Sequence, residues 1–185
     1  ASIIRTMQRY IPSLITLREG LPVSQNNFHF DVQVKDTEIF KKLFFIPVEV
    51  HMPASLAGYV NDKDEQLRLE GSFPRITYNG TLYESASLLF ENPSDKFNCQ
   101  ARTSMLMGSG AMLNLSVDMK AEQDRMQTVL NWGNNTDVTY GGQLSTVTSF
   151  YKTKGRSPIL QAEIEILPTK IVLNDTVWSI RSSHV

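Results

Sequence analysis

Hydrophobic and polar residues alternate with a period of two from about residue 54 almost to the end of the chain. Residues 113–120 and 160–166 give the cleanest examples of this alternation. Successive side chains of a β-strand point to opposite faces of a sheet, so each such segment is predicted to be a strand with one apolar and one polar face. The pattern therefore predicts a mostly β fold built from about ten short strands.

Short segments rich in Asn, Asp and Gly separate these predicted strands. Asn79-Gly80 is the strongest hairpin signal, because a two-residue turn of type I′ needs a positive φ at both positions. Asn174-Asp175 separates the last two predicted strands in the same way. We therefore expect consecutive strands to run antiparallel.

The first part of the chain follows a different pattern. Apolar residues within 1–22 have a helical spacing, but Pro12 argues against one continuous helix. Residues 28–34 alternate strictly and are predicted to form a strand. Residues 36–46 are predicted to form a short helix, because an N-capping aspartate precedes a helical run of apolar residues and a proline follows it.

We divide the chain into an N-terminal segment, residues 1–53, and an antiparallel β domain, residues 54–185, which we expect to be continuous with flanking chain. Strands that are apolar on one face allow two architectures. An elongated, curved antiparallel sheet would line an open, taco-like trough with its apolar face. A β-sandwich would instead cover that face with a second sheet. A parallel sheet covered by helices is disfavoured, because its strands are apolar on both faces.

Charge and composition narrow the possible functions. The 185 residues include 18 Lys and Arg against 19 Asp and Glu, so the net charge of −1 gives no basic footprint for nucleic acid. Hydrophobic residues make up 41% of the chain, yet no apolar stretch approaches the roughly 18 residues of a transmembrane helix. Cys99 is the single cysteine and can form neither an internal disulfide nor a multi-cysteine zinc site.

The sequence gives only weak signals for catalytic or metal-binding groups. Asp62, Asp64 and Glu65 share one predicted turn, but the central glycine and further oxygen ligands of a calcium loop do not follow. We interpret this cluster as a solvated turn. No Gly-x-Ser-x-Gly elbow occurs, and the Gly-Ser-Gly turn at 108–110 lacks the Lys-Ser/Thr pair of a phosphate loop. The sequence therefore predicts a protein that is not an enzyme, with no metal site and no cofactor.

Two further groups have alternative interpretations. Trp132 and Trp178 end predicted strands on apolar faces, where they could stack against a sugar ring, although lining a groove or filling a core is favoured. Lys152, Lys154 and Arg156 form a small basic cluster. This cluster is interpreted as a solvated loop, and contact with anionic lipid headgroups is the alternative.

The apolar faces of the predicted strands supply candidates for a lipid groove. A trough of apolar side chains would let acyl chains leave water, with a gain of about 0.8 kcal/mol for each buried CH₂, and it needs no reactive group. The same side chains could instead form a closed core. The groove candidates, taken from the strands with the clearest alternation, are Leu115, Val117, Met119, Leu130, Trp132, Ile164 and Ile166.

Four segments carry a resemblance to a known family. Residues 68–79 (RLEGSFPRITYN), 130–135 (LNWGNN), 140–144 (YGGQL) and 166–180 (ILPTKIVLNDTVWSI) resemble the C-terminal region of TamB-like proteins. These are large AsmA-like envelope proteins of Gram-negative bacteria. The last segment is the most specific, since it combines a strand, an Asn-Asp turn and a strand with tryptophan.

The resemblance implies an elongated β-taco with an apolar groove and no catalytic residues. It implies a periplasmic portion of an inner-membrane-anchored protein, which serves phospholipid transport between the inner and outer membranes or outer-membrane protein assembly. The implied partners are phospholipid acyl chains and an outer-membrane assembly protein of the Omp85 type. The helical pattern at 36–46 departs from an uninterrupted trough and is a candidate plug or cap. A carbohydrate-binding sandwich and a structural spacer are the alternative functions.

Overall fold

The described residues form one antiparallel sheet and one helix. The structure is a computed structural model, and it describes residues 2–15, 26–38, 47–93, 96–134, 140–154 and 158–184. The elements are α1 (Ser2–Tyr10), β1 (Asn27–Val34), β2 (Val48–Val50), β3 (Ala54–Asn61), β4 (Gln66–Tyr78), β5 (Thr81–Glu91), β6 (Phe97–Leu106), β7 (Met112–Glu122), β8 (Arg125–Asn134), β9 (Gly141–Lys152), β10 (Leu160–Ile166), β11 (Thr169–Leu173), β12 (Thr176–Ile180) and β13 (Ser183–His184).

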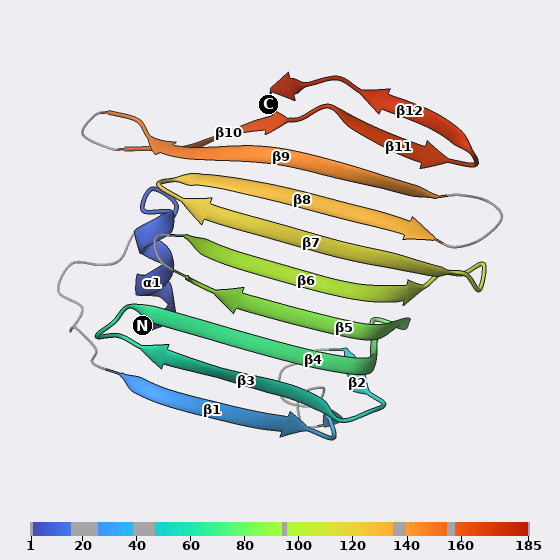
Figure 1. The fold of residues 1–185 in the computed structure, drawn as a ribbon, viewed down its shortest axis with the longest axis horizontal. Coiled ribbons are helices and arrows are strands. Elements are labelled where there is room, and N and C mark those ends of the chain that lie inside the picture. Colours follow the sequence, from blue (N-terminus) through green and yellow to red (C-terminus); the bar gives the residue numbers. More distant parts are fainter. Residues whose placement is uncertain are drawn as a thin grey trace.

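The sheet has 13 strands, and its main path is β1-β3-β4-β5-β6-β7-β8-β9-β10-β13 (Figure 1). β2 pairs with β4, while β11 pairs with β9 and β12. The path does not close, because β1 and the last strands lie at opposite edges. The predicted fold class, a mostly β protein with one long antiparallel sheet, is confirmed. Among the described strands there is no second sheet of the kind that a sandwich would need.

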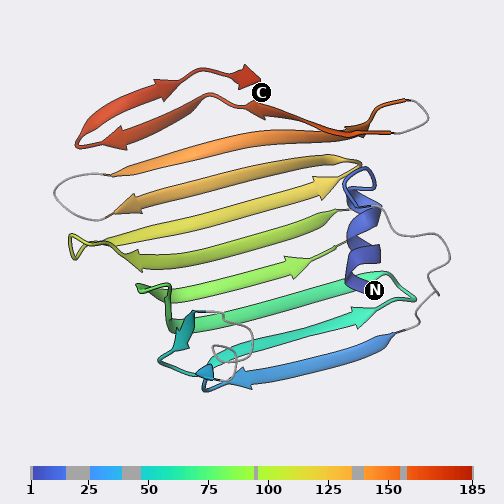
Figure 2. The same cartoon turned by 180° about the vertical axis from the view of Figure 1, so that it is seen from behind.

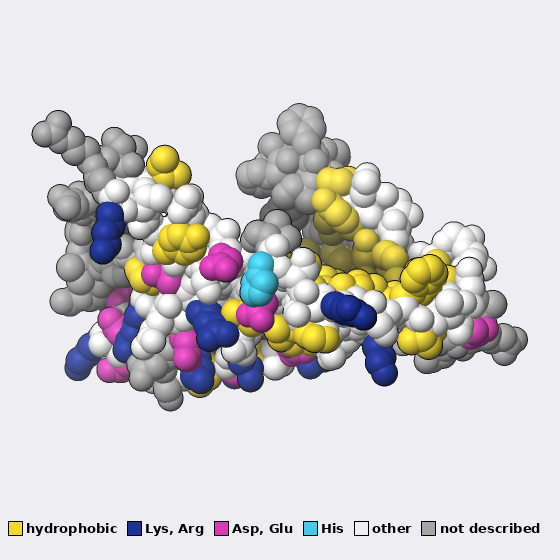
Figure 3. Space-filling view, turned by 90° about the horizontal axis from the view of Figure 1, so that it is seen from above, with side chains coloured by type: hydrophobic (Ala, Val, Ile, Leu, Met, Phe, Trp, Pro, Cys, Tyr) yellow, Lys and Arg dark blue, Asp and Glu magenta, His cyan; other side chains and the backbone are white. Residues whose placement is uncertain are grey.

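Cross-strand pairing gives the sheet one apolar and one polar face, because directly paired residues point to the same side. One apolar row consists of Val32, Leu56, Gly71, Leu88, Ala101, Val117, Leu130 and Leu144. The neighbouring row on the opposite face consists of Gln33, Ser55, Ser72, Ser87, Arg102, Ser116, Asn131 and Gln143. In Figure 3, hydrophobic side chains line a hollow on one side of the molecule, and many charged side chains gather on the other.

The predicted hairpins form at the expected turns. Asn79 and Gly80 have φ values of 49° and 82° and connect β4 to β5, as a type I′ turn requires. Asn174 and Asp175 connect β11 to β12 with φ values of 49° and 59°. These turns fix the register of the two hairpins that they close.

The first helix ends two residues before Pro12 and packs on the apolar face. Figures 1 and 2 show α1 lying across the ends of the central strands, and it contacts β4 and β7. Tyr10 and Ile11 are buried there, with only 2% and 6% of their surfaces exposed. They complete a cluster with Val60, Leu67, Phe97, Cys99 and Ala121.

The N-terminal strands belong to the same sheet as the rest. The predicted strand at 28–34 corresponds to β1, which pairs with β3. The predicted helix at 36–46 lies mostly outside the described residues, although Asp36 accepts a hydrogen bond of 2.8 Å from the Glu38 N–H, as an N-cap does.

A single-layer sheet leaves an unusually large surface exposed. The accessible surface is 12524 Å², whereas a compact protein of 20.9 kDa would expose roughly 9,000 Å². Large apolar side chains on this face stay exposed on the last strands, among them Leu173 and Trp178. The apolar face of the sheet is therefore only partly covered.

Candidate functional site

The uncovered part of the apolar face forms a hollow of about 500 Å³. That volume lies within the range of roughly 300–1,000 Å³ typical of small-molecule sites. The hollow extends over β4 to β8 and is bounded by β2, which folds back onto β4. Figure 3 shows its hydrophobic floor. Its aliphatic and aromatic lining residues are Val48, Phe73, Ile76, Tyr78, Tyr83, Ala86, Leu88, Ala101, Leu115, Val117 and Leu130.

The hollow offers few polar groups to a ligand. The backbone N–H and C=O groups of its floor belong to interior strands, where they pair with neighbouring strands. Arg102 also borders the hollow, but its guanidinium bonds Gln100 at 3.3 Å and Asp118 at 3.4 Å. Gln100 and Asp118 form a direct pair on the polar face. The guanidinium is therefore directed away from the hollow.

Aromatic rings lie over glycines at three places on this face. A Cβ on Gly142 would lie 2.4 Å from Cζ2 of Trp132, its direct cross-strand partner. A Cβ on Gly71 would lie 2.8 Å from Cε2 of Phe73. The pair of Phe30 and Gly58 repeats the arrangement at β1 and β3, where a Gly58 Cβ would lie 2.9 Å from the ring. Glycine thus lets a ring lie against the sheet.

The strict alternation shifts by one residue inside β4 and β5. Ser85 has a φ of 53°, and the pairing of β5 with β6 changes register between Glu84 and Ser87. Phe73 and Ile76 are three residues apart, yet both line the hollow. This β-bulge redirects side chains and brings residues beyond it onto the apolar face.

The predicted groove residues divide into four groups, of which the first three lie on β7 and β8. Leu115, Val117 and Leu130 line the hollow, while Met119 packs against the cluster beneath α1. Trp132 is the cross-strand partner of Leu115 and lies over a glycine next to the hollow.

Ile164 and Ile166 extend the same face farther along the sheet, on β10. They pair with Thr148 and Thr146 of β9, and Ile164 is 37% exposed. The structure thus places all seven candidates on one face but brings only three of them to the hollow itself.

Sequence reasoning missed most of the hollow on the β4–β5 side. Tyr83 and Ile76 form a direct pair beyond the bulge, so their positions do not follow from the alternation in 67–73 or 86–90. Val48 comes from β2, whose pairing with β4 joins distant segments. The register shift and the long-range pairing have no clear signal in the sequence, except that a proline, Pro74, lies within β4 beside the bulge.

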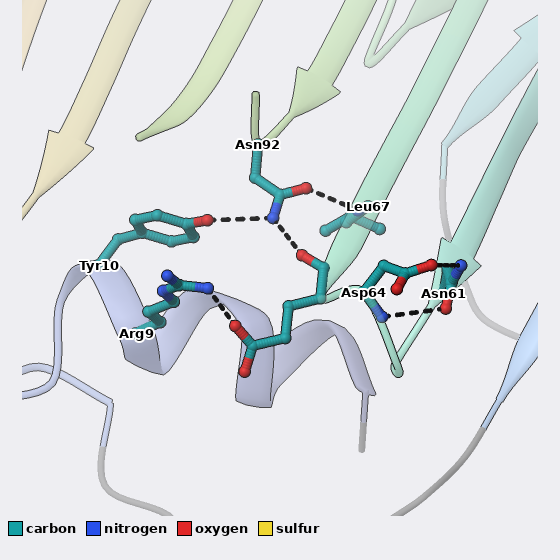
Figure 4. Close-up of polar contacts among 7 residues, drawn as sticks. Arg9, Tyr10, Asn61, Asp64, Leu67 and Asn92 are labelled. Carbon is teal, nitrogen blue, oxygen red and sulfur yellow. Dashed lines mark hydrogen bonds and ion pairs between the residues drawn. The ribbon is translucent and has the colours of Figure 1, made fainter. Parts of the chain in front are cut away.

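Turn residues hold the end of α1 against the sheet. The Asn92 side chain donates to the Tyr10 hydroxyl at 3.0 Å and to the Glu65 carbonyl at 2.5 Å, and it accepts from the Leu67 N–H at 2.6 Å (Figure 4). Arg9 forms an ion pair with the Glu65 carboxylate. Asn92 is itself buried, so this network joins α1 to the strand ends.

A second polar anchor follows α1. Asp124, in the β7–β8 turn, accepts hydrogen bonds from the Ser13 N–H at 2.7 Å and from the Ser13 hydroxyl at 2.8 Å. The Asp124 N–H donates to the Tyr10 carbonyl at 2.9 Å. Asp124 has a φ of 60°, so the turn and the anchor depend on the same residue.

The acidic turns hold their carboxylates in local contacts. Asp64 accepts from the Asn61 amide at 2.7 Å, and Asp62 accepts from the Asn26 N–H at 2.9 Å. In the described part of the chain, no group of three or more His, Cys, Asp or Glu side chains is arranged to hold a metal ion. Cys99 is buried, and burial together with the nearby Asp118 carboxylate raises the pKa of its thiol. A high pKa makes a thiol a poor nucleophile at neutral pH.

The tryptophans and the basic cluster do not form a polar site among the described residues. A polar hollow of about 330 Å³ borders Trp132, Asn114 and Asn131. The Trp132 ring lies over Gly142 on the apolar face, however, whereas Asn131 follows the polar row. Trp178 is 58% exposed on β12, in the cross-strand row that runs through Ile171 and Gly142 to Trp132 on the apolar face. Of the basic cluster, Arg156 lies outside the described residues.

Comparisons of the chain with protein-family models, curated proteins and solved structures gave no significant match. Among the described residues, no helix has the length and apolar character needed to cross a membrane.

Proposed function

We propose that this protein binds the acyl chains of lipids in the hollow on the apolar face of its sheet, without chemical turnover. The observation that carries the proposal is the hollow of about 500 Å³, whose floor consists of aliphatic and aromatic side chains from β4 to β8. A ligand there gains stability from leaving water, at about 0.8 kcal/mol for each CH₂ that becomes buried.

An acyl chain fits the hollow better than a peptide or a sugar. A peptide that adds to a sheet needs an unpaired strand edge, but the floor consists of interior strands. A sugar needs several hydrogen-bond partners, but Ser87, Arg102 and Ser116 at the border of the hollow belong to the cross-strand row of the opposite face. The Thr103 hydroxyl donates to the Glu84 carbonyl at 3.2 Å. An acyl chain has no polar groups to satisfy and can bend to follow the floor.

We further propose that the chain acts as a module of a TamB-like envelope protein in the periplasm. The resemblance of residues 50–185 and the open, one-sided sheet support this proposal. In that setting the apolar face would carry phospholipids between the inner and outer membranes, or serve outer-membrane protein assembly with a partner of the Omp85 type. Passive movement of a lipid along an apolar face would require no catalytic group.

A binding assay tests the central proposal. Purified protein is titrated with cis-parinaric acid, a fatty acid whose fluorescence rises in apolar surroundings, and lipids retained during purification are extracted and identified. We expect saturable binding and co-purified phospholipid. The matched variants are Leu130→Asn, which alters the floor, and Val129→Asn, which alters the opposite face of the same strand.

The result expected for these variants is weaker binding for Leu130→Asn and unchanged binding for Val129→Asn. Equal loss in both variants would place the ligand elsewhere. No fluorescence change and no retained lipid in the wild-type protein would overturn the proposal.

A further inference from the structure

We propose that the apolar surface beneath α1 is a second acyl-chain subsite, continuous with the open hollow, and that α1 occupies it as a displaceable plug. This inference rests on the proposed binding of acyl chains in the hollow. It adds two features to that function: a site for the distal part of a long acyl chain, and the helix α1, which controls access to this site.

Three neighbouring strands show that the covered and the open surfaces are continuous. On β6, Ala101 lines the hollow and Cys99 lies in the buried cluster with Tyr10. On β7, Val117 lines the hollow and Met119 packs against the cluster. Residues two apart on a strand share a face and are separated by roughly 7 Å. An acyl chain lying along the strands would therefore pass from the open hollow onto the surface beneath α1.

Leu88 of β5 belongs to both surfaces. It lines the hollow and packs against the buried cluster. The next residue on the same face, Phe90, packs against Phe97 with their ring centroids 5.9 Å apart, and Phe97 packs against Tyr10 at 6.1 Å. The described contacts thus run from the floor of the hollow to the helix without a polar barrier.

The contacts that hold α1 on the apolar face are of a kind that an acyl chain can replace. A helix of nine residues is too short to be stable alone in water, so α1 depends on its contacts with the sheet. Among the side chains that the structure describes at the end of α1 and just after it, Tyr10 and Ile11 are buried, and Met7 and Ile15 are partly buried. These are apolar contacts, and an acyl chain can make equivalent ones.

The polar contacts of this segment gather at one end of the sheet. Ser13 binds the Asp124 carboxylate in the β7–β8 turn, and the Tyr10 hydroxyl accepts from Asn92 after β5. Arg9 pairs with Glu65 in the turn before β4. The contacts on the apolar floor itself are nonpolar, so loosening the turn contacts should free the helix without removing the floor.

One variant is designed to release the helix. Asp124→Gly removes the carboxylate that holds Ser13, while glycine accepts the φ of 60° that the turn requires. Asp175→Gly makes the same change at a φ of 59° in the β11–β12 turn and serves as the matched control. Because Cys99 is buried in the cluster beneath α1, faster labelling of its thiol by a maleimide reports release without any lipid.

A second variant holds the helix in place. Arg9→Cys with Glu65→Cys, in a Cys99→Ala background, replaces the ion pair by two thiols that a short bismaleimide can join. The same protein without cross-linker is its control. Circular dichroism and urea unfolding establish that every variant retains the folded sheet.

The experiment compares decanoate and stearate as competitors of cis-parinaric acid. Each additional CH₂ that becomes buried should raise affinity by up to about fourfold. We expect the advantage of stearate over decanoate to grow in Asp124→Gly, to stay at the wild-type value in Asp175→Gly, and to shrink in the cross-linked protein. Decanoate, which the open hollow accommodates, should bind all variants alike.

Two outcomes separate the inference from the function on which it rests. If both fatty acids bind but their affinity ratio is the same in the released, cross-linked and wild-type proteins, the plug is refuted and the hollow stands. If neither fatty acid binds any variant, the proposed function fails and the subsite fails with it. If Asp124→Gly does not fold, the comparison of cross-linked with unlinked protein decides the question.

Discussion

A charge placed in the hollow should impair ligand binding far more than folding. Leu115 lines the hollow and is partly exposed, whereas Leu67 lies in the cluster beneath α1 with 4% of its surface exposed. We expect Leu115→Asp to tolerate water around its carboxylate when the hollow is empty. Leu67→Asp would instead bury a charge without a partner.

The magnitudes follow from burial. Burying a whole leucine side chain is worth about 1.5–3 kcal/mol, so Leu115→Asp should lose about 1 kcal/mol from the partial burial and about 1 kcal/mol from the poor strand preference of Asp. Leu67→Asp loses the whole free energy of burying the leucine side chain and must also desolvate or neutralise its carboxyl group. The unfolding free energy should therefore fall by about 4 kcal/mol or more.

The assay combines urea unfolding with titration by cis-parinaric acid. For Leu115→Asp we expect a folded protein destabilised by about 2 kcal/mol, whose affinity falls about a hundredfold or more because the ligand would strip water from the charge. Ile164→Asp, at a residue that is 37% exposed on β10, should be at least as stable as Leu115→Asp. If Leu115→Asp unfolds as readily as Leu67→Asp, the hollow is a sealed core and the reasoning is wrong.

Three further predictions follow from other parts of the sheet. Gly142→Ala places a Cβ 2.4 Å from the Trp132 ring, so we expect the ring to move away from the sheet. The tryptophan emission spectrum should change, and the unfolding free energy should fall by about 1–3 kcal/mol. An unchanged spectrum would contradict the packing of the Trp132 ring over Gly142. The Cys99 thiol has a raised pKa in the folded state, so its contribution to stability is present below its ordinary pKa of 9.0 and is lost as the pH rises above 9.0. Above pH 9.0, the unfolding free energy of the wild type should therefore fall more steeply with pH than that of Cys99→Ala. Parallel curves of unfolding free energy against pH would argue against a buried thiol. Among the described strands, β12 pairs only with β11, so one of its edges is unpaired, and Val177 and Trp178 are exposed to 61% and 58%. We expect this edge to make the isolated chain self-associate. Sedimentation velocity should show association that Val177→Lys weakens, and a strict monomer at high micromolar concentration would refute the prediction.

The strands and turns could be predicted because their signals are local. Residues 113–120 alternate along their whole length, and a strand exposes that alternation directly as two faces. Asn79-Gly80 fixes a hairpin through its own φ preferences, and that hairpin sets the pairing of β4 with β5. Neighbouring strands linked by such turns pair with each other, which yields the long antiparallel sheet.

The candidate site could be predicted only in part. Leu115, Val117 and Leu130 follow from alternation, and they lie on the floor of the hollow. Tyr83 does not, because the bulge at Ser85 separates it from the alternation of Ala86 and Leu88 and changes the face on which its side chain lies. A bulge depends on how two neighbouring strands pair, so the periodicity within one strand does not predict it.

By itself, the sequence determined that each strand has one apolar face, but only the tertiary structure decided what covers that face. The Tyr10 hydroxyl accepts a hydrogen bond from Asn92, 82 residues away, and the Ser13 N–H donates to Asp124 across 111 residues. Such contacts depend on where the whole sheet places its turns, so no local pattern encodes them. The open hollow exists because α1 covers one end of the apolar face and β2 borders the other, which leaves the floor between them exposed.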